Sequence, residues 1–200
     1  MARGDTRERI VRTAMELFWA KGYGSTSIAD ILSRTQTNSG SLYHFFPAKQ
    51  DLLIAVLDGY REGIGPMLLE PAWAGELDPV ERVFALLATY RASLVATDCA
   101  YGCPIGSLAL ELHEADPAVR ERIAANFEAW VAAVRGCYAA AAERFPAGTD
   151  FQALAELTLS VMEGGVMQAR THRDLGHFDR GVAQLRRHIE LITQREGSPA

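Results

Sequence analysis

Tyr43, His44 and Lys49 lie close together in the stretch GSLYHFFPAKQDLL, residues 40–53, of this 200-residue chain. A phenol, an imidazole and an ammonium group can all donate hydrogen bonds to an oxyanion, and the ammonium adds a full positive charge. Such groups on one surface favour a phosphate-rich partner such as nucleic acid. The alternative is a solvated polar face with no partner, so the elements that hold these side chains have to be considered next.

Residues 40–46 divide into two faces when they are placed on a helix at 100° per residue. The apolar face holds Leu42, Phe45 and Phe46, and the polar face holds Gly40, Ser41, Tyr43 and His44. Glycine lets a helix approach another surface closely, at a cost of about 1 kcal/mol relative to alanine. The pattern therefore predicts a short helix that is anchored by one face and can enter the major groove of DNA with the other.

Charge is distributed unevenly along the chain, whose formal net charge is −5. The first 50 residues contain seven Lys or Arg against four Asp or Glu, a net charge of +3, and the other 150 residues carry −8. A basic N-terminal part is compatible with a nucleic-acid partner even though the whole chain is acidic.

The composition indicates a folded protein, because 48% of the residues are hydrophobic and 200 residues can bury a sizeable core. No run approaches the roughly 18 apolar residues that suggest a membrane span. The N-terminal residues mix arginine with acids and lack the apolar core of a secretion signal. We therefore expect a cytoplasmic protein with no membrane partner.

Helix signals dominate and predict an all-α fold. Three helices are expected at about residues 6–21, 27–34 and 39–46, with Thr26 or Ser27 as the cap of the second and Asn38 or Ser39 as the cap of the third. This is a helix-turn-helix plan, and we predict a DNA-binding domain over 1–48 and a larger helical domain over 49–195. In the second domain we expect helices near 48–65, 80–96, 104–114, 117–145 and 151–173 and one after 177, with a connection over 66–79.

The last predicted helix carries apolar residues at spacings of 4, 3, 4 and 3, namely Phe178, Val182, Leu185, Ile189 and Ile192. Such a seam packs one helix against another, either within one subunit or between two. We favour a homodimer interface, because a two-fold symmetric operator is matched by a two-fold symmetric protein. Gly164 and Gly165 lie inside the preceding helix, where they cost stability unless another backbone or a ligand comes close.

The run AMELFWAKGYGSTSIADILSRTQTNSGSLYHFFPAKQDLL resembles the N-terminal DNA-binding domain of the tetracycline-repressor (TetR) family over about forty positions. The resemblance implies a homodimeric, ligand-responsive regulator, usually a repressor, that binds a palindromic operator in double-stranded DNA and a small molecule in its second domain. By position it implies phosphate contacts from Thr26, Tyr43, His44 and Lys49, base or groove-edge contacts from Asn38, Ser39, Gly40 and Ser41, and a DNA-proximal cap at Ser27.

Two further stretches of the sequence extend the resemblance, and two sites in the DNA-binding part depart from it. SVMEGGVMQAR looks like the penultimate helix used in dimerisation, which adds Val161, Gly164 and Gly165 to the expected dimer interface, and YGCPIGSLALEL looks like a helix of LmrA-type members. The family often has Gly-Val where this chain has Gln36-Thr37, so the turn must form without glycine. Ser39 replaces what is often a longer side chain.

The expected effector is a small hydrophobic or aromatic molecule that releases the repressor from its operator, with the fourth helix as the lever. Its pocket should lie among the helices after residue 80, although the same apolar residues can fill an ordinary core. Candidate lining residues are Trp73, Phe84, Tyr90, Trp130, Met162 and Met167. A member that binds DNA without any effector is the alternative.

The sequence also contains residues that could support redox, metal or enzyme chemistry. Cys99 and Cys103 could form a redox-sensing pair, although two buried small hydrophobic residues are the simpler interpretation. His172, Asp174 and His177 could chelate a metal, but they occupy a polar corner between helices. The chain has no nucleophile elbow and no P-loop or dinucleotide glycine pattern. We therefore predict no catalytic residue, no cofactor and no metal, and keep a small helical enzyme as a remote alternative.

Overall fold

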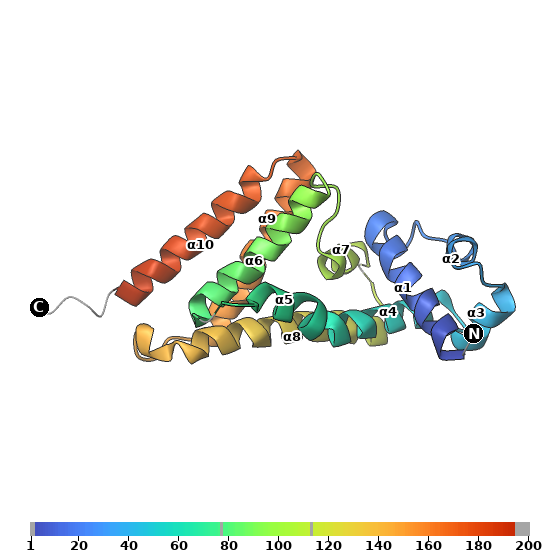
Figure 1. Ribbon diagram of the computed structural model, residues 1–200, viewed down its shortest axis with the longest axis horizontal. Coiled ribbons are helices and arrows are strands. Elements are labelled where there is room, and N and C mark those ends of the chain that lie inside the picture. Colours follow the sequence, from blue (N-terminus) through green and yellow to red (C-terminus); the bar gives the residue numbers. More distant parts are fainter. Residues whose placement is uncertain (1–2, 77, 113, 195–200) are drawn as a thin grey trace, which may run out of the picture. The chain divides into compact units, whose positions relative to one another are not determined.

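The computed structural model describes residues 3–76, 78–112 and 114–194, and within these ranges the chain is helical and has no strand (Figure 1). The expected all-α fold is confirmed. None of the described helices is long and apolar enough to cross a membrane. The elements are α1 (Arg3–Lys21), α2 (Ile28–Thr35), α3 (Ser39–Phe45), α4 (Lys49–Gly63), η1 (Ile64–Leu69), α5 (Glu70–Trp73), α6 (Pro79–Ala96), α7 (Pro104–Glu111), α8 (Pro117–Ala140), η2 (Ala142–Arg144), α9 (Phe151–His172) and α10 (Gly176–Gln194).

Packing divides the chain into two compact units, which are described separately. The first unit comprises Met1–Gly63 and Cys103–Phe127, so α7 and the first part of α8 share a core with the helix-turn-helix. In this core Leu42 of α3 belongs to the same buried cluster as Leu52 of α4 and Leu108 of α7. This packing unit extends beyond residue 48. The predicted boundary between a DNA-binding domain and an effector-binding domain at residues 48 and 49 therefore stays a prediction.

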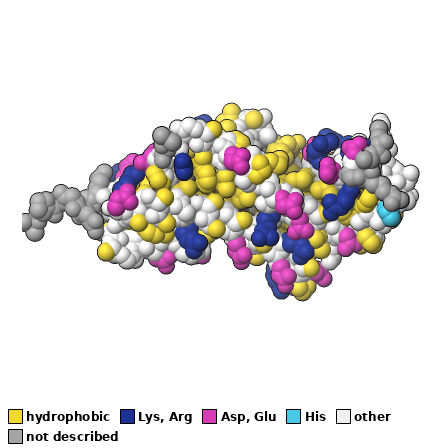
Figure 2. Space-filling model, turned by 60° about the horizontal axis from the view of Figure 1, so that its bottom comes forward, with side chains coloured by type: hydrophobic (Ala, Val, Ile, Leu, Met, Phe, Trp, Pro, Cys, Tyr) yellow, Lys and Arg dark blue, Asp and Glu magenta, His cyan; other side chains and the backbone are white. Residues whose placement is uncertain are grey.

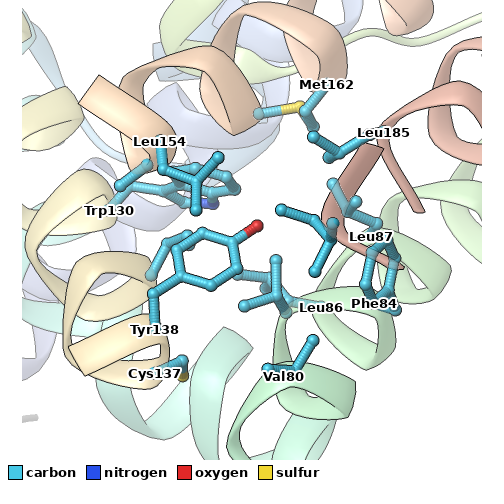
Figure 3. Close-up of a cluster of buried hydrophobic side chains, with 14 of the residues drawn as sticks. Val80, Phe84, Leu86, Leu87, Trp130, Cys137, Tyr138, Leu154, Met162 and Leu185 are labelled. Atoms are coloured by element: carbon cyan, nitrogen blue, oxygen red, sulfur yellow. The ribbon is translucent and has the colours of Figure 1, made fainter. Parts of the chain in front are cut away.

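The second unit comprises Ile64–Gly102 and Glu128–Ala200. Within it α6, α9 and α10 pack on one another, and their apolar side chains surround Trp130 and Tyr138 of α8 (Figure 3). The Tyr138 hydroxyl lies 3.0 Å from the Thr158 hydroxyl of α9, so the phenol is satisfied inside an apolar core. Burial raises the pKa of Tyr138 to about 12.

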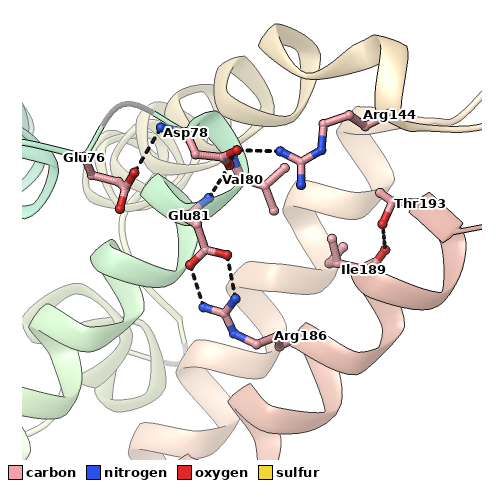
Figure 4. A network of polar contacts seen from close by, with 8 residues as sticks. All are labelled: Glu76, Asp78, Val80, Glu81, Arg144, Arg186, Ile189 and Thr193. Atoms are coloured by element: carbon pink, nitrogen blue, oxygen red, sulfur yellow. Dashed lines mark hydrogen bonds and ion pairs between the residues drawn. The ribbon is translucent and has the colours of Figure 1, made fainter.

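Ion pairs at the start of α6 join three elements of the second unit (Figure 4). The Asp78 carboxylate caps α6 by accepting the Val80 and Glu81 amides and also accepts from Arg144 at 2.7 Å. Glu81 accepts two hydrogen bonds from the Arg186 guanidinium of α10, at 2.6 and 2.9 Å. These contacts fix α10 and the end of η2 to the first turn of α6.

Two predicted boundaries differ from the structure. The segment over residues 66–79, predicted as a connection, is helical for most of its described length, with η1 and α5. Pro66 cannot occupy a regular α-helix interior without a clash with the preceding turn, and the wider π-helical turn of η1 accommodates it. The helix that begins at Pro117 ends at Ala140 rather than near residue 145, and the short 3₁₀ element η2 follows.

Candidate nucleic-acid interface

Helix α3 separates its residues as the sequence predicted. Leu42 and Phe46 are buried in the first unit and Phe45 is half-buried, whereas His44 is exposed and Tyr43 keeps 49% of its surface exposed. Ser39 and Gly40 are also exposed, and Ser41 is half-buried. The helix therefore holds one polar face outward on an apolar anchor, which suits a groove of nucleic acid.

Side-chain caps fix where α2 and α3 begin. The Ser27 hydroxyl accepts from the Asp30 amide at 3.1 Å while the Asp30 carboxylate accepts from the Ser27 amide at 2.9 Å, a complete capping box. Asn38 caps α3, since its Oδ1 accepts from the Ser41 amide at 2.8 Å. The first turn of α3 has no acidic residue, whereas Asp30 already supplies a negative charge to the start of α2. The start of α3 is therefore the better place for a phosphate.

Thr26 occupies a different place from the one predicted. Its side chain is fully buried, and its hydroxyl donates to the carbonyl oxygens of Gly22 at 2.8 Å and Leu17 at 3.3 Å. A phosphate contact from this hydroxyl is not compatible with that packing. Thr26 instead ties the start of α2 to the end of α1, which positions Ser27 beside it.

Lys49 is engaged with the protein rather than extended into solvent. Its ammonium donates to the Tyr23 carbonyl oxygen at 2.5 Å and lies 4.1 Å from the centre of the Tyr23 ring. Burial lowers the pKa of Lys49, and the nearby Glu111 carboxylate acts in the opposite direction. The charge of Lys49 is thus held at a fixed place beside the loop between α1 and α2.

The turn between α2 and α3 forms without glycine, as the sequence required. Gln36 adopts a left-handed conformation with φ of 52° and its amide donates to the Leu32 carbonyl. Thr37 is half-buried and its hydroxyl donates to the Thr35 carbonyl at 3.4 Å. A non-glycine residue in this conformation costs roughly 1 kcal/mol, which the surrounding turn offsets.

The charge around this interface is less basic than the first 50 residues alone suggested. The two segments of the first unit carry ten Lys or Arg against eleven Asp or Glu, a net charge of −1. On the face shown in Figure 2, basic and acidic side chains are interspersed. Affinity for DNA must therefore come from local contacts more than from a broad positive field.

The seam on α10 packs within its own chain. Phe178, Leu185 and Ile189 are buried in the core of the second unit, and Val182 and Ile192 pack against that core half-buried. Gly165 of α9 is buried too: a Cβ added there would lie 3.0 Å from Cδ2 and 3.3 Å from Cα of Phe178. Phe178, Leu185, Ile189 and Gly165 therefore bury their surface against their own protomer, and their part in a dimer interface stays a prediction.

Val161 and Gly164 differ from the rest of the predicted interface. Both are half-buried, and apart from the neighbouring residues and backbone of its own helix, no described atom lies within 4 Å of the point where a Cβ on Gly164 would stand. On α10, a Cβ at Gly181 would meet Val161 Cγ1 at 3.5 Å, so the stripe through Gly181 borders the stripe through Val161 and Gly164. The same two helices carry three exposed large apolar side chains among the described residues, Leu157, Met167 and Leu191, with 43%, 50% and 52% of their surface exposed.

Most predicted effector-lining residues belong to the core of the second unit. Phe84, Trp130 and Met162 are buried, and Trp73 and Tyr90 pack against them half-buried. Met167 is exposed and does not join this core. Trp130 keeps only 4% of its surface exposed. Its buried indole Nε1 has no hydrogen-bond partner among the described residues.

The sulfur and imidazole candidates show ordinary environments. Cys99, Cys103 and Cys137 are buried and lie outside any disulfide. Burial raises the pKa of Cys137, which opposes thiolate formation. The His172 and His177 rings stack with centroids 4.3 Å apart at the corner between α9 and α10. Within the described residues, no group of three His, Cys, Asp or Glu side chains is arranged to hold a metal ion.

Glu111 holds the loop between α1 and α2, a contact that the sequence did not predict. Its carboxylate, at the end of α7, accepts hydrogen bonds from the amides of Tyr23 and Gly24 in the loop between α1 and α2. The partners are 88 and 87 positions apart in the chain, and neither periodicity nor spacing connects them.

Comparisons with known proteins agree with this arrangement. Residues 10–56 match the family described as bacterial regulatory proteins, tetR family. Residues 79–185, more than half of the chain, match the family described as tetracyclin repressor-like, C-terminal domain.

Individual relatives extend the match over nearly the whole chain. The uncharacterized HTH-type transcriptional regulator Rv0196 of Mycobacterium tuberculosis is 34% identical over 185 residues, covering 90% of this chain and 92% of the relative. The HTH-type transcriptional regulator LmrA of Bacillus subtilis is 30% identical over 131 residues, 65% of this chain and 69% of LmrA. A crystal structure of a TetR transcriptional regulator from Chloroflexus aurantiacus aligns with a TM-score of 0.81 at 30% identity, over 94% of this chain and 96% of that chain. The chain therefore belongs to the TetR family of transcriptional regulators, which bind DNA through a helix-turn-helix and are not enzymes.

Proposed function

We propose that this regulator is a homodimeric repressor that binds a palindromic operator and is released by a small hydrophobic or aromatic effector. The observation that carries the DNA-binding part is the division of α3 into a buried apolar face and an exposed polar face.

Two similar proteins support the proposed repressor function. DhaR of Mycobacterium sp. (strain GP1), 24% identical over 90% of this chain and 89% of DhaR, is an HTH-type transcriptional repressor. A cysteine mutant of the TetR family regulator CifR, similar in fold with a TM-score of 0.72, has been solved with 26-bp double-strand operator DNA.

The proposed DNA contacts come from α3 and from the helix starts beside it. Tyr43 and His44 can donate to phosphate oxygens, and Gly40 lets the α3 backbone approach the groove closely. Lys49 supplies a fixed positive charge beside them, while Thr26 positions the start of α2 from within the core. The proposed contact set is Ser27, Asn38, Ser39, Gly40, Ser41, Tyr43, His44 and Lys49.

The proposed dimer interface uses the outer faces of α9 and α10. Leu157, Val161 and Gly164 recur on α9 at helical spacing, Gly181 of α10 borders Val161, and Leu191 is an exposed apolar side chain on α10. Two copies of this face can form a four-helix arrangement in which the small Gly164 and Gly181 permit close approach. A two-fold interface of this kind gives two recognition helices for the two half-sites of an operator.

The proposed effector site lies in the core of the second unit, around Trp130. A buried donor without an acceptor costs about 1–3 kcal/mol, and a ligand that brings an acceptor removes that cost. We therefore assign the effector an apolar body with one acceptor, such as a carbonyl. Acetophenone and ethylbenzene differ in this acceptor, so acetophenone should raise the melting temperature more, and Trp130→Phe should abolish the difference. Equal shifts in the wild type would contradict the assignment.

Release of DNA follows from differential affinity. If the effector binds more tightly to the conformation in which the two recognition helices do not match the operator, it shifts the dimer away from DNA by about 1–3 kcal/mol. Helix α4 is a suitable lever, since the Tyr60 hydroxyl donates to the Met15 carbonyl of α1 and the Asn126 amide of α8 donates to the Leu57 carbonyl.

A binding titration tests the proposed function. The DNA upstream of the gene for this protein is labelled, and its affinity is measured at one fixed salt concentration. His44→Ala should weaken binding roughly tenfold, the effect of one lost charge-assisted contact, whereas His188→Ala on α10, another exposed histidine, should not. Equal affinity of wild type and His44→Ala would overturn the site, and no binding by the wild type would overturn the function.

A further inference from the structure

The loop between α1 and α2 is held by a carboxylate from a distant part of the chain. Glu111 Oε2 accepts from the Tyr23 amide at 2.9 Å, and Oε1 accepts from the Gly24 amide at 2.5 Å. Both oxygens are thus bonded to adjacent amides of one loop, an arrangement that binds anions well and uses charge-assisted hydrogen bonds. All three residues belong to the first unit.

Two glycines make room for this carboxylate. A Cβ on Gly22 would lie 2.9 Å from Glu111 Oε2, and a Cβ on Gly24 would lie 3.0 Å from Oε1. Gly22 also has a φ of 86°, which disfavours other residues there. The sequence Gly-Tyr-Gly is therefore shaped to receive Glu111 as well as to end α1.

The other side of the same loop holds two groups of the proposed interface. The Tyr23 carbonyl and ring hold the Lys49 ammonium, and the Gly22 carbonyl accepts from the buried Thr26 hydroxyl next to the α2 cap. A shift of residues 22–24 would therefore move Lys49 and the start of α2 together. Glu111 fixes the loop from the side of α7.

We propose that Glu111 is a positioning residue for operator binding, which acts through the loop of residues 22–24 on Lys49 and on the start of α2. The proposal rests on the proposed DNA-binding function. Glu111 touches no DNA in this scheme: its carboxylate orders the backbone that carries the contacting groups. Because α7 supplies it, any change in the position of α7 reaches the interface through this side chain.

Removing the carboxylate tests the proposal. Glu111→Ala should weaken binding of the upstream DNA fragment roughly tenfold, on the scale of lost hydrogen bonds to a charged group, and should speed amide hydrogen exchange in a peptide spanning residues 22–26. Glu111→Gln keeps the size of the side chain and serves if the alanine variant does not fold. Glu121→Gln makes the same change of charge at an exposed position of the same unit and should change neither quantity.

A double-mutant cycle separates positioning from general structural support. In a Lys49→Met background the cost of Glu111→Ala should fall to less than half of its value in the wild type, because the two residues act through one loop. An undiminished cost, or unchanged exchange in residues 22–26, would overturn the proposal. If the wild type does not bind the fragment, the proposed function fails, while the exchange measurement still decides whether Glu111 orders the loop.

Discussion

Helices α3 and α10 are both amphipathic, and they use their faces differently. In α3 the apolar face anchors a short helix and the opposite polar face is exposed. In α10 the apolar seam from Phe178 to Ile192 has the regular spacing of an intersubunit contact, yet its centre is buried in its own chain. The surface of α10 that we propose for a partner includes Gly181 and Leu191. Periodicity therefore identifies which face of a helix is buried, but not which molecule buries it.

The largest expected effect comes from truncating a side chain of the α10 seam. Phe178→Ala removes a fully buried ring that packs directly on Gly165, so the free energy of unfolding should fall by about 3–5 kcal/mol. Denaturant unfolding at one fixed protein concentration measures this loss. Val95→Ala, an exposed apolar position on α6, should cost less than about 0.5 kcal/mol. If Phe178→Ala lost little free energy of unfolding but the dimer dissociated, the seam would belong to the dimer interface instead.

A charge on the outer face should separate the protomers. Leu157→Glu places a carboxylate on the proposed dimer face, where a second copy brings an equivalent one, so light scattering should find monomers at micromolar concentration. Operator affinity should fall by roughly a hundredfold, because one half-site no longer reinforces the other. Val95→Glu adds the same charge to an exposed apolar position on α6, which is not part of the proposed face, and should remain dimeric. Dimers of Leu157→Glu with normal DNA affinity would contradict the proposed interface.

Local signals account for what the sequence predicted well. The caps at Ser27 and Asn38, the stop before Pro47 and the inward side of α3 depend on neighbours within a few positions. The burial of Thr26, the hold on Lys49 and the Glu111 contact depend on residues that the fold brings together from far along the chain or from another element. The helical course of residues 66–73 differs from the predicted connection because Pro66 and Pro71 resemble breaks unless a wider helical turn is considered.

A smaller change in stability is expected from a substitution in the turn between α2 and α3, next to the proposed DNA-binding helix. Gln36→Gly places the residue best suited to a positive φ at a position whose φ is 52°. Relief of that strain is partly offset by the greater freedom of glycine in the unfolded chain, so we expect a gain of up to about 1 kcal/mol. Thermal unfolding measures it, and Thr37→Gly, at a position without positive φ, should destabilise instead. A loss of stability for Gln36→Gly would show that the backbone at Gln36 is not strained.

The smallest effect concerns how α10 is fixed to α6, and it depends on pH. Arg186 hydrogen-bonds the Glu81 carboxylate and lowers its pKa below the ordinary 4.5. A carboxylate with a lowered folded-state pKa stabilises the protein above its unfolded pKa, and the contribution is lost as the pH falls through the folded value. Since the pair is partly exposed, Glu81→Gln should cost about 0.5 kcal/mol at pH 7. The difference from the wild type should shrink once the pH falls below the unfolded pKa and close below the folded pKa of Glu81. Glu128→Gln, an exposed glutamate of the same unit, supplies the control. A cost that stays constant between pH 7 and pH 3 would show that packing of Arg186 on Phe84, rather than the ion pair, holds this end of α10.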